Sequence, residues 1–355
     1  MSATKDTVRL VGEPIAVNNN FDMLRFGFAA MVFFVHSYAL SGNVHLAWIP
    51  QVVSSEMAVH AFFVVSGFLI FMSYENTHGL KCYFEKRARR IYPAYFTIVM
   101  LCALCGGLLS ALPLADYLTA PGLYRYLAAN LVFLNFVHPD LPGVFSGNAI
   151  TAVNGALWTL KSEVLFYLSV PLLVLLFKRI GYGRGIVLIY AGSYVYFLAM
   201  GELARQHGGV YVELQRQLPG QMMYFMAGTA VYYFYREFLK HAYWLLAAAL
   251  VVFLLEGFRM AGLVEPVALA IVVAYMAFKL PYLGNFGKYG DFSYGLYVIH
   301  FPVLQTLVMF GIFREHPWSG LAMATVLVLT SAMLMWHMVE KPFLRKASHY
   351  VAVTN

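Results

Sequence analysis

The most constraining feature of this sequence is a series of long apolar runs with few charges. The runs lie at 23–40, 56–73, 91–111, 156–177, 185–203, 219–236, 242–257, 262–280, 291–313 and 319–340. Several approach the roughly 20 residues that an α-helix needs to cross a bilayer. Because they are continuous and do not alternate apolar with polar residues, they do not fit the strands of a membrane barrel. The sequence therefore predicts an all-α, polytopic membrane protein of about ten transmembrane helices.

Composition supports this fold class. Hydrophobic residues make up 61% of the chain and charged residues 12%, about half the roughly 25% of a soluble domain. The formal charge of +7 comes from 24 basic and 17 acidic residues. In a membrane protein such an excess is typical of basic cytoplasmic loops. No basic stripe interleaved with exposed aromatic residues indicates a nucleic-acid partner.

An eleventh apolar stretch, at 124–137, is shorter and contains Asn130 and Asn135. Loop charges indicate whether it spans. With a cytoplasmic N-terminus, 74–90 is also cytoplasmic. If 124–137 does not span, the later basic residues stay on the same side: Lys178, Arg179, Arg184, Arg236, Lys240, Lys279, Lys288, Lys341, Arg345 and Lys346. The positive-inside rule favours this arrangement. We therefore expect 124–137 to be a re-entrant or interfacial helix, and both termini to be cytoplasmic.

The expected domain organisation is simple. Residues 1–20 are a polar cytoplasmic segment, 21–345 form one membrane domain, and 346–355 are a short tail. The stretch 138–155 is rich in Gly, Pro and Asn, which predicts a loop. Nothing in the sequence indicates an oligomeric state.

Two ionisable residues in the first run, Arg25 and His36, are eleven positions apart. Eleven residues make close to three helical turns, so both lie on one face, about 16 Å apart along the axis. Ionisable groups inside a membrane segment are costly and indicate function. Each residue alone also fits a structural role, as a snorkelling anchor for Arg25 and a helix-packing hydrogen bond for His36. Their alignment favours a long ligand with an anionic head near Arg25 and a reactive end near His36.

Further charged residues lie in or beside later runs. Arg87 and Arg90, spaced i, i+3, share a helix face before the third run, and arginine forks suit phosphate. A basic cluster at a cytoplasmic helix end also follows from topology alone. Glu163 lies inside an apolar run, where a glutamate needs a partner or a proton, so a buried salt bridge is the alternative to a catalytic role. His300 precedes Pro302 in mid-run, and a structural role for it is as well supported as a catalytic one.

No metal site is predicted. Cys102 and Cys105 form a C-x-x-C pair inside an apolar helix. A zinc site needs about four nitrogen or sulfur ligands, and no second pair is present. The cysteines are therefore interpreted as small packing residues.

Five stretches together resemble the acyltransferase 3 family of integral-membrane acyltransferases. They are the R-x10-H spacing of Arg25 and His36, FFVVSGFLI (62–70), KRARRIYPAY (86–95), WTLKSEVLFY (158–167) and SYGLYVIHFPV (293–303). The resemblance covers about 18–345. NNFDMLRF, HSYALSG and LPGVF are similar to the bacterial branch that contains O-antigen and exopolysaccharide O-acetyltransferases.

The resemblance implies a fold of about ten helices and a function. Cytoplasmic acyl-CoA, with acetyl as the expected acyl group, would donate to a sugar hydroxyl across the bacterial inner membrane. Arg25, Arg87 and Arg90 would bind the CoA phosphates. His36 would be the general base, with Glu163 orienting His36 or the acceptor, and His300 is the third candidate catalytic residue.

The sequence also permits other readings. A proton-coupled transporter or flippase of a polar solute would use His36, Glu163 and His300 as a proton relay. Transporters often show inverted repeats, and no internal symmetry is evident here. The acyl group, the acceptor hydroxyl, and direct transfer versus an acyl-enzyme are not distinguished by the sequence.

Overall fold

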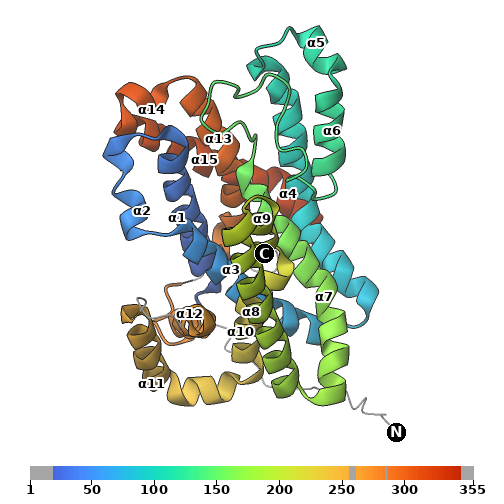
Figure 1. Cartoon of the computed structure of the whole chain (residues 1–355), viewed down its shortest axis with the longest axis vertical. Helices are drawn as coiled ribbons and strands as arrows, with labels where there is room; N and C mark the ends of the chain where they lie inside the picture. The colour runs from blue at the N-terminus through green and yellow to red at the C-terminus, as the bar shows by residue number, and fades with distance from the viewer. Residues whose placement is uncertain (1–18, 256–260, 285, 345–355) are drawn as a thin grey trace. The chain divides into compact units, whose positions relative to one another are not determined.

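The computed structural model describes residues 19–255, 261–284 and 286–344, and every regular element among them is helical (Figure 1). Within these described ranges, seven stretches are long and apolar enough to cross a membrane. Their main helices are α1 (Phe21–Ser41), α3 (Ser55–Glu75), α4 (Leu80–Leu109), α7 (Trp158–Ile180), α8 (Tyr182–His207), α11 (Tyr235–Leu254) and α15 (Pro317–Met335). The predicted polytopic helical membrane fold is confirmed.

The remaining predicted spans also coincide with helices, but shorter ones. They are α10 (Leu218–Tyr233), α12 (Ala261–Phe278) and α13 (Ser293–Met309). The π-helical segment η4 (Trp336–Glu340) and α16 (Lys341–Phe343) continue α15. The number of helices that span therefore stays a prediction, as does the predicted single domain 21–345. The predicted segments 1–20 and 346–355 lie almost wholly outside the described residues.

The stretch 124–137 is helical only in its first half. After α5 (Leu114–Thr119), α6 covers Pro121–Asn130, and turns follow to Val137. The helix ends in a turn where Phe133 has φ 65° and the N–H of Leu134 donates to the Ala129 carbonyl at 2.9 Å. Asn130 ties the helix to the chain beyond this turn, because its Nδ2 donates to the carbonyls of Tyr126 and His138, each at 2.9 Å. A helix through 137, as predicted, is too long. Its placement at the membrane stays a prediction.

Contacts divide the chain into two compact units. The first comprises residues 1–21, 63–84 and 166–283, and the second comprises 22–62, 85–165 and 284–355.

The first unit is built around close packing of α3 and α10. A Cβ at Gly67 would collide with the carbonyl of Phe225, so only glycine permits this approach. At the end of α3, Glu75 accepts hydrogen bonds from Tyr232 at 2.7 Å and Tyr233 at 2.6 Å. Asn20 donates to the carbonyls of Met276 and Pro281, each at 3.2 Å, which joins the start of α1 to the end of α12.

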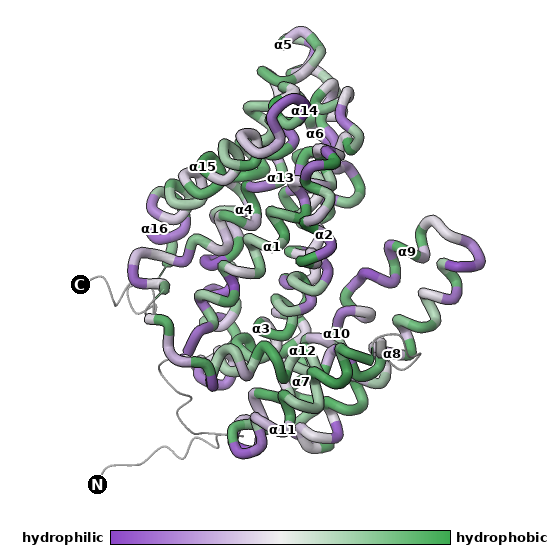
Figure 2. The backbone as a smooth tube through the Cα atoms, turned by 90° about the vertical axis from the view of Figure 1, so that its left-hand side faces the viewer, coloured by the Kyte–Doolittle hydropathy of each residue, from purple (hydrophilic) through white to green (hydrophobic). Residues whose placement is uncertain are grey.

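Hydrophobic and hydrophilic residues of the first unit lie on different helices. Figure 2 shows hydrophobic residues along α10 and α12, and hydrophilic residues around the short helix α9 (Val210–Gln215). α8 and α11 expose most of their side chains, since only 11% and 17% of their apolar windows are buried. In a membrane those two helices present the surface that faces lipid.

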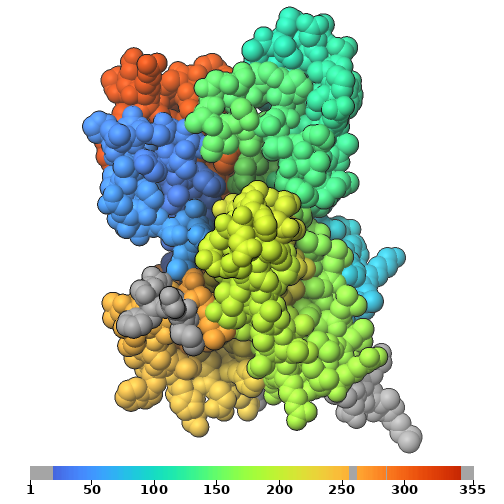
Figure 3. Space-filling model, viewed as in Figure 1, coloured from blue at the N-terminus to red at the C-terminus, as the bar shows by residue number. Residues whose placement is uncertain are grey.

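The second unit holds the candidate site. It combines α13 and α15 with most of α1 and α4, the first parts of α3 and α7, and the long connection at 131–154. At one end, η1 (Val44–Leu46) and α2 (Ile49–Val52) lie beside α14 (Ile312–Glu315), as the blue and orange surfaces in Figure 3 show. Asn43 Nδ2 donates to the carbonyl of Phe313 at 2.8 Å and fixes this contact.

Candidate active site

An ionic cluster joins three helices of the second unit. Arg25 of α1 and Arg90 of α4 both bind Oδ2 of Asp291, which precedes α13. The Arg25 Nη2–Asp291 distance is 2.9 Å, and Arg25 Nη2 also lies 2.5 Å from Asp22. Arg90 Nη1 lies 3.1 Å from Glu340 at the end of η4. Two of the three arginines predicted to bind phosphate are thus held together by one carboxylate.

Asp291 is buried and fully engaged. Its Oδ1 accepts the backbone N–H of Ser293 at 3.1 Å and the Ser293 hydroxyl at 2.5 Å, at the start of α13. Asp291 lies outside the helical spans. Burial opposes its ionisation, but Arg25, Arg90 and the bonds from Ser293 outweigh burial and hold the pKa of Asp291 at about 2. The carboxylate is therefore ionised at neutral pH.

Aromatic rings enclose the Arg90 guanidinium. Its Cζ lies 5.9 Å from the ring centroids of both Tyr294 and Trp336, within the range of a cation–π contact. Gly290, just before Asp291, has φ 133°. A Cβ there would run into the Trp336 indole, so the chain needs glycine to bring Asp291 to the arginines.

A histidine pair joins α1 and α13. Nδ1 of His36 lies 2.8 Å from Nε2 of His300, and the two rings are nearly parallel, at 14°. His300 is fully buried, while His36 is half-buried. The rings of Phe33 and Phe301 pack edge-on against this pair. The structure thus brings together two of the three predicted catalytic residues.

Hydrogen bonding defines the tautomers of the neutral pair. Nδ1 of His300 lies 3.2 Å from the Leu296 carbonyl, which can only accept, so His300 Nδ1 carries its proton. Nε2 of His300 must then accept the proton on His36 Nδ1. The remaining ring nitrogen of His36, Nε2, consequently has a lone pair available to accept a proton.

α13 stays helical across Pro302. Proline has no N–H, so the carbonyl of Val298, four residues earlier, loses its helical partner. Asn154 Nδ2 donates to that carbonyl at 2.8 Å. The same replacement occurs in α7. Pro171 leaves the Tyr167 carbonyl without its helical partner, and the Tyr83 hydroxyl donates to that carbonyl at 3.1 Å. Such replacement partners make membrane prolines tolerable.

A second buried amide fixes the connection that carries Asn154. Gln305 of α13 donates to the carbonyls of Ile150 at 2.7 Å and Ala152 at 2.8 Å. Its Oε1 accepts from Asn148 Nδ2 at 2.7 Å. The connection at 148–154 therefore lies against the helix that carries His300 (Figure 1).

The remaining predicted residues lie on α4 and α7. Arg87 is half-buried, one turn before Arg90. Glu163 is half-buried on α7, one turn after Thr159. The Thr159 hydroxyl lies 2.7 Å from that of Tyr297, whose ring packs against His300. Glu163 thus extends the face of α7 that contacts the His300 helix, and its role stays a prediction.

Sequence reasoning missed several residues of this site. None of Asp291, Glu340, Asn154 and Gln305 was predicted to belong to it. The one available signal was Pro302 within an apolar run, since a freed carbonyl requires a donor elsewhere. Asn154, in a polar loop, gave no indication that it supplies this donor.

Comparisons with known proteins show what the chain is similar to. The model of the acyltransferase 3 family, described as an acyltransferase domain, matches residues 18–337. Nodulation protein 10 of Rhizobium leguminosarum bv. viciae is 26% identical over 366 residues, covering 94% of this chain and 95% of that protein. An O-acetyl transferase of Shigella phage Sf6 is 25% identical over 335 residues, covering 93% and 97%. No solved structure matches the chain.

Proposed function

The chain belongs to the acyltransferase 3 family, and on that premise we propose that it moves an acetyl group from acetyl-CoA to a sugar hydroxyl of a surface polysaccharide. Family membership and the apolar helices make it a membrane O-acyltransferase. The phage relative is named an O-acetyl transferase, which supports acetyl as the acyl group. O-antigen and exopolysaccharide are the proposed acceptor classes.

The observation that carries the mechanism is the chain from the Leu296 carbonyl through His300 to His36. It supports Nε2 of His36 as the general base. In the proposed step the acceptor hydroxyl gives its proton to Nε2 while its oxygen attacks the thioester carbonyl. A C–O bond forms, the C–S bond breaks, and the departing CoA thiolate takes the proton from His36. Direct transfer of this kind needs no acyl-enzyme.

His300 acts on the acceptor through His36 and is therefore a positioning residue. Its Nε2 accepts the Nδ1 proton of His36, which fixes the ring orientation and stabilises the imidazolium formed during transfer. Its complete burial keeps water from competing for that bond. Glu163 is proposed to orient the acceptor from α7.

Arg25, Arg87 and Arg90 are proposed to bind the CoA phosphates. Guanidinium groups suit phosphate because they donate in a planar fork. Asp291 holds Arg25 and Arg90 side by side, which supports a pre-oriented phosphate site. Arg25 and His36 lie on one face of α1, about 16 Å apart along its axis. The pantetheine arm of CoA is comparable in length to that separation.

The same geometry supports a direction of transfer across the bacterial inner membrane. The arginine cluster lies near the start of α1, and His36 lies in its last turns. With the N-terminus in the cytoplasm, the donor would bind at the cytoplasmic face. The acetyl group would then be delivered toward the outer half of the membrane.

The decisive experiment is mass spectrometry of surface polysaccharide from cells with the gene intact, deleted, or carrying His36→Ala. We expect loss of one acetyl unit per repeat in both altered strains, with His36→Ala protein still present in the membrane. His316→Ala, an exposed histidine outside the pair, serves as the matched control. An unchanged polysaccharide in the deletion strain would contradict this acceptor class, and full acetylation with His36→Ala would remove His36 from the mechanism.

A further inference from the structure

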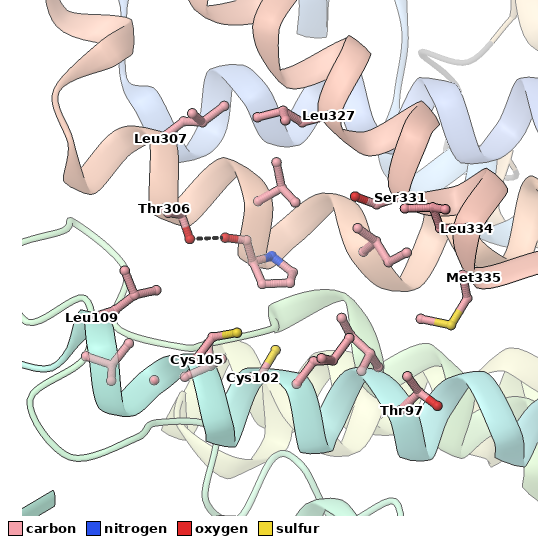
Figure 4. Close-up of a pocket in the computed structure, with 18 of the residues that line it drawn as sticks. Thr97, Cys102, Cys105, Leu109, Thr306, Leu307, Leu327, Ser331, Leu334 and Met335 are labelled. Atoms are coloured by element: carbon pink, nitrogen blue, oxygen red, sulfur yellow. Dashed lines mark hydrogen bonds between the residues drawn. The ribbon is translucent and has the colours of Figure 1, made fainter. Parts of the chain in front are cut away.

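A cavity of about 520 Å³ lies between α4, α13 and α15 in the second unit. Figure 4 shows Thr97, Cys102 and Cys105 of α4 facing Thr306 and Leu307 of α13, with Ser331 and Met335 of α15 completing the wall. Most of the other lining side chains are aliphatic. Its volume lies within the roughly 300–1,000 Å³ of small-molecule sites.

The cavity is poorly suited to hold water. The Thr97 hydroxyl donates to the Pro93 carbonyl and the Thr306 hydroxyl to the Pro302 carbonyl, each at 2.8 Å. These two hydroxyls are thus engaged within their own helices. The thiols of Cys102 and Cys105 are weak hydrogen-bonding groups. Because a buried water needs two to four polar partners, the lining favours an apolar occupant.

The mouth of the cavity opens onto an apolar surface. Among its lining residues, Leu101 is 46% exposed, Leu334 54% and Met338 71%. These residues belong to two stretches long and apolar enough to cross a membrane. In a bilayer their exposed faces contact lipid hydrocarbon, so the cavity is continuous with the lipid-facing surface.

We propose that this cavity binds one hydrocarbon chain of a bilayer lipid. The lipid chains next to the mouth supply an occupant of the required chemistry. An acetyl group is far smaller than the cavity, which disfavours the acyl group of the donor. The flexible side chains of Met335 and Met338 can adapt to a chain of variable shape.

The site has a direct connection to the histidine pair. Ile299, Pro302 and Val303 line the cavity and surround His300 along α13. Val153, next to the Asn154 that caps the Val298 carbonyl, also lines it. A bound lipid chain therefore packs against the helical turn that carries His300, and against the connection that stabilises that turn.

The test uses the full chain in vesicles of phosphatidylcholine with a diazirine in one acyl chain. After illumination, peptides are mapped by mass spectrometry, without donor or acceptor. We expect several-fold more adducts at cavity residues of 97–109 and 327–339 than on α8 and α11, which expose most of their surface. Equal labelling of all lipid-facing helices would mean only a general lipid shell and would overturn the proposal. Displacement of the adducts by palmitoyl-CoA would assign the cavity to a long-chain donor instead.

Two cavity-filling variants with matched controls make the test specific. Ser331→Phe fills the cavity from α15, and Thr330→Phe places the same side chain on the exposed neighbour. Cys105→Phe fills it from α4, and Leu104→Phe is its control. We expect several-fold loss of cavity adducts in the filling variants only, with unchanged elution on size exclusion. If one filling variant aggregates, the test rests on the other one. Cavity adducts that persist in a folded filling variant would reject the lipid site. Because the readout is lipid labelling, its outcome is independent of whether the proposed acetyl transfer is correct.

Discussion

Oδ2 of Asp291 lies 2.9 Å from Nη2 of Arg25, and the same oxygen also binds Arg90. One buried carboxylate therefore holds two guanidinium groups from two helices, which would repel each other without it. Its other oxygen is bound to Ser293, so α13 begins at this contact. Asp291 consequently determines where α1, α4 and α13 meet.

Asp291→Asn should destabilise the protein by about 3 kcal/mol, since removing one member of a buried ion pair leaves uncompensated charge. Thermal unfolding of the purified protein in detergent measures the change. Asp22→Asn is the control, because Asp22 also binds Arg25 but is more exposed than Asp291, so its loss should lower the free energy of unfolding less. Equal destabilisation by the two variants would contradict the bridging role.

The pH dependence of this cluster has a defined sign. The pKa of Asp291 is held at about 2, below its usual value of 3.8. A depressed folded pKa adds stability that is present above pH 3.8 and is lost as pH falls toward 2. We expect the difference in melting temperature between wild type and Asp291→Asn to stay constant from pH 8 to pH 5. A difference that shrinks over that range would show that Asp291 takes up a proton there.

His300→Phe should lower kcat while leaving KM for both substrates near the wild-type value. The phenyl ring keeps most of the volume but cannot accept the His36 proton. The loss should be smaller than the roughly 10²–10⁴-fold expected for removing the base itself with His36→Ala. Steady-state kinetics on purified protein measure both constants, with His316→Phe as the exposed control. A raised KM with unchanged kcat would instead place His300 in substrate binding.

Arg25→Ala should weaken acetyl-CoA binding by roughly 10- to 100-fold, because a hydrogen bond to a charged group contributes about 1.5–3 kcal/mol. Arg25→Lys should recover only part of this affinity, since lysine lacks the planar fork. Calorimetric titration of folded protein provides the measurement, and Arg314→Ala, on the exposed helix α14, is the control. Wild-type affinity in Arg25→Ala would remove this residue from the donor site.

Asn154→Ala should lower the free energy of unfolding by about 1–3 kcal/mol, because it leaves the Val298 carbonyl buried without a donor. Pro302→Ala restores a backbone N–H at position 302 and can satisfy that carbonyl within the helix. We therefore expect Asn154→Ala to be less destabilising when combined with Pro302→Ala. A double-mutant cycle of unfolding free energies measures this coupling, and strictly additive effects would show that the two residues act independently.

Much of the fold could be predicted from sequence because apolar runs of bilayer length have few alternatives. All ten predicted spans coincide with helices. The exception, 124–137, depended on a local turn, since Phe133 is left-handed and Asn130 ties the helix to the chain beyond it. Hydropathy carries no information about such a local competition.

The site was predictable as a set of residues but not as an arrangement. His36 and His300 each stood out as an ionisable group in an apolar run. Their contact joins positions 264 residues apart, and helical periodicity says nothing about which helices meet. Asp291 stands at the end of an apolar run, where the sequence indicates no partner for it. Only the packing of three helices makes it the partner of Arg25 and Arg90.

The side-chain donors that compensate for the two helix prolines have an evolutionary consequence. Asn154 donates to the Val298 carbonyl that Pro302 leaves free, and Tyr83 donates to the Tyr167 carbonyl that Pro171 leaves free. Each donor is needed only while its proline is present. Replacing the donor first leaves a buried carbonyl without a hydrogen bond and destabilises the protein. Replacing the proline first restores a backbone N–H, so the side-chain donor is no longer required. Substitutions at these paired sites should therefore accumulate in one order. Among descendants, lineages that keep the proline should retain the distant donor, and those that lose it should be free to vary at both positions.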